Sequence, residues 1–549
     1  MPKVPFWVFI LIAIVYFSAV RVDTMDVDAS QYAEMSREML KSGDYLHVYD
    51  RGADYLDKPP FLFWVSATSM KVFGVNNFGY KLPSILFALL AVYATYRLAK
   101  LLYNDTIGRM AALVLATCQG MFLMTNDIRC DTILMSWVVT AVWLIQEWLV
   151  HRKLKYILLA FAAIAFGMMT KGPIALMVPV FCFATDWALK RQWSNFFRPV
   201  YLLGLVIIAV LLIPMSIGLY QQFDLHPEKV MDGKHGVSGL RFFYWSQSFG
   251  RITGESPWKN EVDLSFLFTN MLWSFLPWIF LFIPALVLNI AELVKQKFRL
   301  QPQQEWVSTG GFLLAYLALG SSAYQLPHYI FVAYPIASIF TAKFIWDITG
   351  GNKYKPVLRF MQPFLAVISV LLLAAVLLLM LFAFPQSPVI IATWVLLFAA
   401  WLYLAFRKTL TAKIFWLTAG AIVIVNVFVS NIIYPALLQY QVGSRAGRFI
   451  HDSNIPTNDV VNYKVNDPLN SIRFYAHGTI ADINFLSELG QRKYLLTMDE
   501  GLSDLRKAGY SFDMLKQGRA FSVSQLTPQF INPETRDKET KAYYIVKLR

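Results

Sequence analysis

The fold class is decided by residues 364–384, which read FLAVISVLLLAAVLLLMLFAF. This stretch has no charged side chain, and its length suits a helix that crosses the apolar core of a bilayer, which takes about 20 residues. The composition of the whole chain agrees: 57% of its 549 residues are hydrophobic, 15% are charged, and the mean hydropathy is +0.47. In soluble domains, roughly a quarter of the residues are charged. We therefore expect a polytopic α-helical membrane protein.

Similar apolar stretches recur almost to the end of the chain. The first one follows Lys3 and resembles a signal peptide, but no small-x-small cleavage site follows it and many spans come after it. We therefore expect a retained first helix. Counting every stretch predicts about thirteen transmembrane helices, at residues 5–22, 82–98, 107–125, 131–150, 155–170, 172–189, 200–220, 264–293, 308–322, 328–346, 361–384, 388–406 and 413–434.

The loops between these helices differ in charge. Alternate loops carry Lys and Arg, and the opposite short loops are nearly free of them. Because cytoplasmic loops have such an excess, we expect a cytoplasmic N-terminus, and the odd number of spans then puts the C-terminal region outside. The residues that set this orientation are Arg97, Lys100, Arg109, Arg152, Lys153, Lys155, Lys190, Arg191, Arg198, Lys295, Lys297, Arg299, Lys353, Lys355, Arg359, Arg407, Lys408 and Lys413.

Three longer segments are predicted on the outer side: loops 23–80 and 221–263, and a polar tail. We therefore divide the chain into a membrane domain, residues 1–436, and a soluble periplasmic domain, residues 437–549. Strand-like runs alternate with helix-like runs in the tail, which is typical of a small α/β domain. The strand-like runs are Val460–Val465 and Tyr543–Leu548, and the helix-like runs are Ser487–Gln491 and Leu502–Ala508.

The net charge of +14 would indicate a nucleic-acid partner in a soluble protein. In this chain, cytoplasmic Lys and Arg facing anionic headgroups explain it better. We therefore expect membrane lipids and no nucleic acid as partners. The three cysteines, Cys118, Cys130 and Cys182, form neither a disulfide framework nor a metal-binding spacing.

The first outer loop has the richest set of ionisable residues near the outer membrane surface, where such groups are costly unless paired or functional. Its residues 30–41 read as an amphipathic helix. One face of this helix carries Tyr32, Met35 and Met39, and its charged residues lie elsewhere. The acidic residues before the helix are Asp23, Asp26 and Asp28, and the charged residues within it are Glu34, Arg37, Glu38 and Lys41.

The same loop continues with the motif Tyr55-Leu56-Asp57-Lys58-Pro59-Pro60 and the aromatic run Phe61–Trp64. The diproline ends any preceding helix, and the aromatic run can lie in the membrane interface. Asp57 and Lys58 would then lie at headgroup depth. An interfacial Asp–Lys pair with a snorkelling lysine explains this motif without a function, and on the loop alone that explanation is slightly favoured.

Four further outer sets have charges of the wrong sign for the topology or lie beside aromatic residues. Paired charges, helix caps or an interfacial belt explain each set without a function, and a lone His is more often structural. The sets are Asn126–Asp131 with Arg129, Thr170–Pro173 with Lys171, Phe242–Glu255 with Arg251, and Gln325–Tyr329 with His328.

Together these sets combine cations, aromatic rings and carboxylates at headgroup depth. Cations beside aromatics suit a lipid phosphate or diphosphate, and a nearby carboxylate suits a general base. The pattern indicates an enzyme that consumes a lipid-linked donor on the non-cytoplasmic face. A transporter or flippase is the alternative, with charges at mid-membrane depth and inverted repeats as its expected features. A non-catalytic membrane scaffold is the third hypothesis.

The order of these motifs resembles the polyprenyl-phosphate-sugar glycosyltransferases of the GT-C fold, and more narrowly the bacterial aminoarabinose (lipid A) transferases and their protein-mannosyltransferase-like relatives. The resemblance covers residues 1–440 and implies a glycosyltransferase of the bacterial inner membrane. The matching pieces are Asp28 with Tyr32-Ala33-Glu34-Met35, Tyr55-Leu56-Asp57-Lys58-Pro59-Pro60, Arg129-Cys130-Asp131, Thr170-Lys171-Gly172-Pro173, Arg251 and Leu326-Pro327-His328-Tyr329.

The resemblance also implies roles for single residues. Asp28 stands where the family has its essential first-loop carboxylate, and Asp131 at a second acidic position, so both are candidate catalytic residues. The residues that would bind the carrier-lipid phosphate are Lys58, Arg251 and Tyr329, with Tyr32 and Tyr55 close to it. Arg129 and Lys171 are further site candidates. The donor would be a polyprenyl-phosphate sugar of the undecaprenyl-phosphate type. The identity of the acceptor stays open between lipid A, a protein and a glycan.

The sequence departs from the family at two points. The usual Asp-Glu pair is Asp28-Ala29 here, and Asp26 is a competing assignment for the essential carboxylate. Asp57 stands where some members bind a divalent metal ion through Glu, but Ser246 and Gln247 occupy the stretch where the metal-binding histidine is expected. One divalent metal bound by Asp57 is therefore an expectation that the sequence supports weakly.

Overall fold

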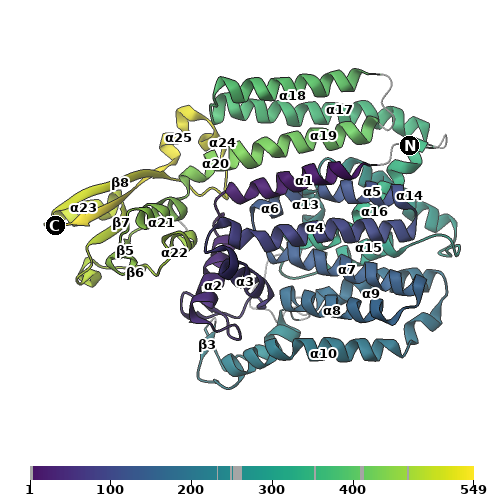
Figure 1. Ribbon diagram of the computed structural model, residues 1–549, viewed down its shortest axis with the longest axis horizontal. Coiled ribbons are helices and arrows are strands. Elements are labelled where there is room, and N and C mark those ends of the chain that lie inside the picture. Colours follow the sequence, from purple (N-terminus) through teal and green to yellow (C-terminus); the bar gives the residue numbers. More distant parts are fainter. Residues whose placement is uncertain are drawn as a thin grey trace.

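The computed structural model describes residues 4–231, 233–247, 250, 262–350, 354–407, 413–465 and 469–549. Most of the chain forms long apolar helices that lie side by side, with a smaller domain of strands and short helices at one end (Figure 1). The N-terminal region lies at the other end of the helices. The architecture therefore consists of a helical part and a smaller part of strands and short helices.

Each predicted span coincides with one or two helices. Within the described residues, eight helices are long and apolar enough to cross a bilayer, or nine if one bent pair counts as a span. The predicted total of about thirteen spans stays a prediction. The membrane-domain helices are α1 (Phe6–Ser18), α4 (Asn77–Leu102), α5 (Asp105–Ala116), α6 (Gln119–Asn126), α7 (Cys130–His151), α8 (Leu154–Lys171), α9 (Ile174–Leu189), α10 (Val200–Leu219), α13 (Phe266–Ser274), α14 (Ile279–Lys295), α15 (Val307–Gly320), α16 (Tyr334–Gly350), α17 (Lys355–Leu378), α18 (Pro388–Phe406) and α19 (Lys413–Phe428).

Two of the predicted spans are interrupted. Span 107–125 consists of α5 and α6, which meet at a bend of 54°. Span 264–293 consists of α13 and α14, and Pro277, which has no backbone N–H, lies between them. The two breaks contact each other, because the backbone N–H of Gln119 donates to the carbonyl of Leu276 at 2.9 Å. Backbone groups freed by the interruptions are thus satisfied inside the protein, as a bilayer requires.

The first outer loop folds into two helices, α2 (Asp28–Ser42) and α3 (Phe61–Phe73), joined through a hairpin of β1 (Tyr49–Asp50) and β2 (Ala53–Asp54). The diproline motif lies at the start of α3, where proline is tolerated. The expected interfacial aromatic run is instead the buried first turn of this helix, with Phe61, Leu62 and Phe63 in the core.

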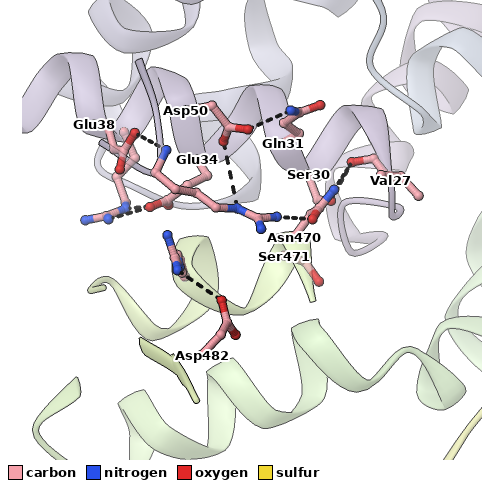
Figure 2. A network of polar contacts seen from close by, with 12 residues as sticks. Val27, Ser30, Gln31, Glu34, Glu38, Asp50, Asn470, Ser471 and Asp482 are labelled. Atoms are coloured by element: carbon pink, nitrogen blue, oxygen red, sulfur yellow. Dashed lines mark hydrogen bonds and ion pairs between the residues drawn. The ribbon is translucent and has the colours of Figure 1, made fainter. Parts of the chain in front are cut away.

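A second face of α2 is also buried. Glu34 and Arg37, which lie away from the face of Tyr32, Met35 and Met39, are both buried, and their side chains form an ion pair at 2.7 Å. Burial of this face follows from the tail, because α22 (Asn470–Ala476) packs against α2. Figure 2 shows Glu34 on α2 above the α22 segment that carries Asn470 and Ser471.

The tail is an α/β unit with a five-stranded sheet of order β6-β5-β7-β9-β8. β5 is parallel to β6 and β7, whereas β9 is antiparallel to β7 and β8. The strands are β5 (Val460–Tyr463), β6 (Ala481–Ile483), β7 (Tyr494–Met498), β8 (Phe512–Ala520) and β9 (Lys541–Leu548), and the remaining helices are α21 (Val442–Asp452), α23 (Asp499–Lys507), α24 (Pro528–Ile531) and α25 (Pro533–Glu539).

Alternating side chains of these strands supply two hydrophobic cores. Val460, Leu496 and Ile545 pack in one cluster with residues of α21 and α22, and their chain neighbours Val461, Leu495 and Val546 pack in a second with residues of α23. Because successive strand residues point to opposite faces, helices cover both faces of the sheet. The domain boundary at residue 436 stays a prediction.

Candidate functional site

The candidate residues come from four elements that meet at the end of the membrane helices nearest the tail. Asp28 begins α2, Arg129 directly precedes α7, and Lys171 ends α8. Tyr329 belongs to η5 (Pro327–Ala333), a 3₁₀ helix that contacts α7. These segments are far apart in the sequence, and each supplies its residue from at or near a helix end.

Arg129 is the centre of the first charged group. Its Nη1 lies 2.7 Å from Oδ2 of Asp28, and its Nε lies 2.8 Å from Oδ2 of Asp127. Nη1 is also 3.5 Å from Nδ1 of His328. The two carboxylates raise the pKa of Arg129 against the opposing effect of burial. The guanidinium therefore stays charged and holds Asp28 in one orientation, with 40% of the Asp28 side chain still exposed.

The second group is an ion pair between Asp131 and Lys171, with Nζ 2.6 Å from Oδ1. Asp131 lies in the first turn of α7 and Lys171 in the last turn of α8, so both charges suit the helix dipoles at these ends. The pair is buried, with only 3% of the Asp131 side chain exposed. Nζ of Lys171 also lies 4.2 Å from the ring centroid of Tyr329.

His328 connects the two groups. Its Nε2 lies 3.6 Å from Oδ2 of Asp131, and its Nδ1 faces Arg129. Its ring also contacts that of Tyr329. The imidazole thus lies between the carboxylate of the buried ion pair and the guanidinium of the exposed one.

Lys58 forms an ion pair with its neighbour Asp57. Burial alone would lower the pKa of Lys58, but Asp57 overrides this and raises it, with smaller contributions from Tyr329 and Cys130. Lys58 is therefore a permanent cation within electrostatic reach of η5 and the start of α7. The side-chain amide of Gln247 donates to the backbone carbonyl of Asp57, which brings the second outer loop to the same place.

Tyr32 and Tyr55 both contact the ring of Phe63, at centroid distances of 5.9 and 6.3 Å. Burial raises the pKa of both phenols well above 10, and the neighbouring carboxylates Asp28 and Asp57 raise it further. Both hydroxyls therefore stay protonated and can act as hydrogen-bond donors to an anion.

A cavity of about 720 Å³ opens beside this cluster. The first outer loop contributes Tyr55 and Asp57 to its lining, and the second contributes Lys234, Arg241 and Ser246. Small-molecule sites span roughly 300–1,000 Å³. The two outer loops thus enclose a space in which a substrate can meet residues of the Tyr55–Pro60 motif.

Of the candidate residues, Asp28, Lys58, Asp131, Tyr329, Tyr32, Tyr55, Arg129 and Lys171 lie in this one cluster. Arg251 lies outside the described residues. The competing assignment of Asp26 fails on geometry, because its carboxylate accepts hydrogen bonds from Ser471 of the tail, whereas Asp28 faces Arg129.

Sequence reasoning missed one buried cation. Nζ of Lys81, near the start of α4, donates to the carbonyls of Ala19, Val22 and Asn126 at 2.9–3.2 Å. It joins the carboxyl ends of α1 and α6 directly below the Asp127–Arg129 loop. The signal was present, because a lysine at the outer end of a span has the wrong sign for the topology.

The fold and this cluster define a polytopic membrane protein of GT-C architecture. A family model, dolichyl-phosphate-mannose-protein mannosyltransferase, matches residues 57–217. In structure, the chain is similar to ArnT from Cupriavidus metallidurans bound to undecaprenyl phosphate, with a TM-score of 0.71 at 16% identity over 98% of both chains. The apo state of that protein gives a TM-score of 0.70 at 15% identity, over 98% of this chain and 97% of that one. The predicted fold class is thereby confirmed.

Curated relatives are named undecaprenyl phosphate-alpha-4-amino-4-deoxy-L-arabinose arabinosyl transferase. The protein from Edwardsiella ictaluri is 26% identical over 336 residues, which are 59% of this chain and 56% of that protein. The protein from Pseudomonas aeruginosa (strain UCBPP-PA14) is 28% identical over 269 residues, 46% of each chain. The chain thus spans about half the length of the curated relatives it matches.

Proposed function

We propose that the chain is a membrane glycosyltransferase that moves a sugar from a polyprenyl-phosphate donor, of the undecaprenyl-phosphate type, to an acceptor. The observation that carries this proposal is the meeting of Asp28, Lys58, Asp131 and Tyr329, from separate segments, in one cluster. A cavity lined by Tyr55 and Asp57 of the same motif as Lys58 opens next to it. The names of the similar proteins support the same chemistry. One is an undecaprenyl phosphate-alpha-4-amino-4-deoxy-L-arabinose arabinosyl transferase, and the other was solved bound to undecaprenyl phosphate.

The reaction is a single displacement at the anomeric carbon. The bond from that carbon to the phosphate oxygen breaks, a bond to the acceptor oxygen forms, and the polyprenyl phosphate leaves with the electron pair. Cations near the leaving oxygens stabilise the charge that grows there. Lys58 is suited to this role, because its ammonium stays charged and its partner Asp57 lies within electrostatic reach of both Tyr32 and Tyr55.

An anionic donor needs cations that are not already matched by carboxylates. Asp28, Asp57, Asp127 and Asp131 carry four negative charges, and Lys58, Arg129 and Lys171 carry three positive ones, which leaves a net charge of −1 among these residues. The cavity lining adds Lys234 and Arg241. Arg251 is a further candidate in the sequence, since Arg grips phosphate through a planar fork.

Asp28 is the residue that we assign to the acceptor. Its carboxylate is oriented by Arg129 at 2.7 Å and has 40% of its side chain exposed. It can take the proton from an acceptor hydroxyl. An acceptor phosphate on lipid A is already largely ionised near neutral pH, and Asp28 would then orient it. Lipid A, a protein and a glycan all stay candidate acceptors.

Asp131 and Lys171 are assigned a supporting role. The buried position of Asp131 keeps it from an acceptor, and its ion pair fixes Lys171 over the ring of Tyr329. This changes the assignment of Asp131 from a catalytic residue to a residue that positions Lys171 and, through His328, Arg129.

The described residues offer little support for a bound divalent metal ion. Among the described residues, no three His, Cys, Asp or Glu side chains are grouped to hold a metal ion. Asp57, the proposed ligand, is paired with Lys58, whose ammonium would compete with a cation. We derive no step through a metal. Treating the purified protein with EDTA tests the expectation directly.

We further propose that the protein lies in a bacterial inner membrane, with a cytoplasmic N-terminus and a periplasmic tail. Positions of the basic loops support this orientation. The N-terminal region and the tail also lie at opposite ends of the helices (Figure 1). Cysteine labelling from either side of sealed vesicles tests the orientation.

The alternative is a transporter or flippase. Its expected mark is a set of ionisable residues at mid-membrane depth, whereas the cluster described here lies at the helix ends. Proteoliposomes with a polyprenyl-phosphate sugar distinguish the two. A glycosyltransferase converts the donor to polyprenyl phosphate and a glycosylated acceptor, whereas a transporter moves it unchanged. Unaltered turnover in correctly inserted Asp28→Asn and Lys58→Ala variants would show that the site is wrongly assigned.

A further inference from the structure

The segment Thr24–Val27 joins the first membrane helix to α2 and ends directly before Asp28. Its polar groups are bound by side chains from the tail as well as by its own neighbours Ser30 and Gln31. The side-chain amide of Gln441 donates to the carbonyl of Thr24 at 3.0 Å and accepts from the N–H of Asp26 at 2.9 Å. One amide thus holds two backbone groups that would otherwise be free to turn.

Tyr475 of α22 holds the start of the segment. The N–H of Thr24 donates to its hydroxyl at 2.6 Å, and that hydroxyl donates to Asn77 at the start of α4 at 2.7 Å. Arg448 of α21 lies 4.4 Å from the centroid of the Tyr475 ring and pairs with Asp23. The tail and the membrane domain therefore share one hydrogen-bond chain at this point.

The side chain of Asp26 is the anchor in the middle of the segment. It accepts from the N–H and the hydroxyl of Ser471, both at 3.0 Å, and from the hydroxyl of Ser30. Asn470 donates through its side chain to the carbonyl of Val27 at 3.3 Å. Figure 2 shows Asn470 and Ser471 of α22 facing Val27 and Ser30.

The contact with Ser471 requires a close backbone approach. A Cβ atom on Gly443, at the start of α21, would lie 2.3 Å from the Ser471 hydroxyl oxygen and 3.4 Å from Oδ2 of Asp26. Both Thr24 and Ser471 are fully buried. The interface is therefore packed around these hydrogen bonds and has no room for a larger side chain at residue 443.

We propose that the tail positions the catalytic carboxylate: Gln441, Ser471 and Tyr475 hold Thr24–Val27 so that Asp28, two residues beyond Asp26, meets Arg129 and the acceptor. Asp26 and these tail residues are positioning residues that act through Asp28. The inference rests on the proposed function and assigns the tail a part in it. Arg129 fixes the Asp28 carboxylate from the site side, and the clamp on Thr24–Val27 fixes its backbone from the other.

This arrangement matters because small displacements of a reacting group have large effects on rate. A misplacement of about 1 Å can cost about a hundredfold. Arg129 holds only the end of the Asp28 side chain, so movement of the backbone would shift the carboxylate relative to Lys58. Loss of the clamp is therefore expected to lower kcat and to leave donor binding nearly unchanged.

The experiment uses the full chain in detergent or proteoliposomes with a polyprenyl-phosphate sugar. Asp26→Ala and Ser471→Ala remove the anchor, whereas Asp26→Asn keeps a carbonyl oxygen for Ser471 and is the conservative variant. We expect the two Ala variants to lower kcat by about 10–100-fold with KM for the donor within about twofold. Asp26→Asn should retain most of the wild-type kcat.

Arg536→Ala is the matched control. Arg536 of α25 donates to the carbonyl of Ala383 at 2.6 Å and so holds the tail to the membrane helices at a place far from Asp28 in the fold. This variant should keep the wild-type kcat. Hydrogen exchange adds a readout that needs no turnover: peptides covering residues 23–30 should exchange faster in Ser471→Ala than in the wild type or in Arg536→Ala.

Two results would overturn the proposal. One is a kcat within about twofold of the wild type in both Asp26→Ala and Ser471→Ala. The other is an equal loss of kcat in Arg536→Ala, which would mean that any weakening of the contact between tail and membrane helices lowers the rate, with no special part for the clamp on Thr24–Val27. If the wild-type chain consumes no donor, the proposed function fails, and unchanged exchange at residues 23–30 then rejects the clamp separately.

Discussion

Two ion pairs at the site have nearly the same length and very different surroundings. Asp28 and Arg129 are 2.7 Å apart with 40% of the Asp28 side chain exposed, whereas Asp131 and Lys171 are 2.6 Å apart with 3% of the Asp131 side chain exposed. An exposed carboxylate can reach a substrate. A buried one is held in place by its partner and leaves an uncompensated charge if that partner is removed. Exposure, more than distance, therefore separates the reactive pair from the supporting pair.

The largest expected effect comes from Asp28→Asn. This variant keeps the size of the side chain and a hydrogen bond to Arg129 but removes the base. For an acceptor hydroxyl, kcat should fall by about 10²–10⁴-fold, and the unfolding temperature should stay unchanged. Donor consumption and thermal unfolding of the same preparation check both. If Asp131→Asn lowers kcat equally without loss of stability, the distinction between the two pairs is wrong.

The next effect is on stability and concerns Lys171→Met, which leaves Asp131 buried without its cation. Removing one partner of a buried pair destabilises by about 3–5 kcal/mol. We expect a large drop in the unfolding temperature in detergent. The double variant Lys171→Met with Asp131→Leu is the control and should recover most of that loss, since it removes both charges. A single variant as stable as the wild type would contradict the supporting role.

A smaller effect, on donor binding, is expected for Lys58→Ala. This variant tests a third ion pair, Lys58 with Asp57, whose exposure is intermediate, with 14% of the Lys58 side chain and 30% of the Asp57 side chain exposed. A hydrogen bond to a charged group contributes about 1.5–3 kcal/mol, so the KM for the donor should rise by about 10–100-fold. Titration of donor binding checks this. An unchanged donor affinity would remove Lys58 from the phosphate site.

The smallest effect is a pH dependence at the clamp. Burial raises the pKa of Asp26 to about 6, against the lowering effects of its hydrogen bonds to Ser30 and Ser471 and of Arg51. The folded state therefore prefers protonated Asp26. This contribution to stability is complete below the unfolded pKa near 4 and is lost as pH rises through about 6. The unfolding temperature should fall modestly between about pH 4 and pH 6, and Asp26→Asn should not show this fall. An identical pH profile in both proteins would exclude Asp26 as its source.

The membrane architecture could be predicted because apolar length is a local property. The stretch 364–384 has the same meaning in any tertiary context, and α17 covers most of it. The interruptions within 107–125 and 264–293 were not predicted. Pro277 is a local signal for the second break, but the contact between the two breaks, Gln119 with Leu276, joins segments far apart in the chain and no local pattern carries it.

Site candidates could be found where a charge contradicts the topology. Arg129 and Lys171 were found in this way, whereas Asp28 and Lys58 came from the crowded first outer loop and the family resemblance. The structure brings all four together. Lys81 carries the same signal and was overlooked, because it falls between the predicted outer loop 23–80 and the predicted span 82–98 and was assigned to neither. The buried Glu34–Arg37 pair had no signal at all, since its burial comes from α22, more than 400 residues later in the chain.

By itself the sequence determined the membrane class, the expected orientation and the residues whose charge is expensive at the outer surface, because hydropathy and charge act residue by residue. Only the tertiary structure decided which of those charges pair, which stay exposed, and which of the neighbouring carboxylates Asp26 and Asp28 faces the site. These outcomes depend on burial, and burial is set by segments that meet in space while lying far apart along the chain.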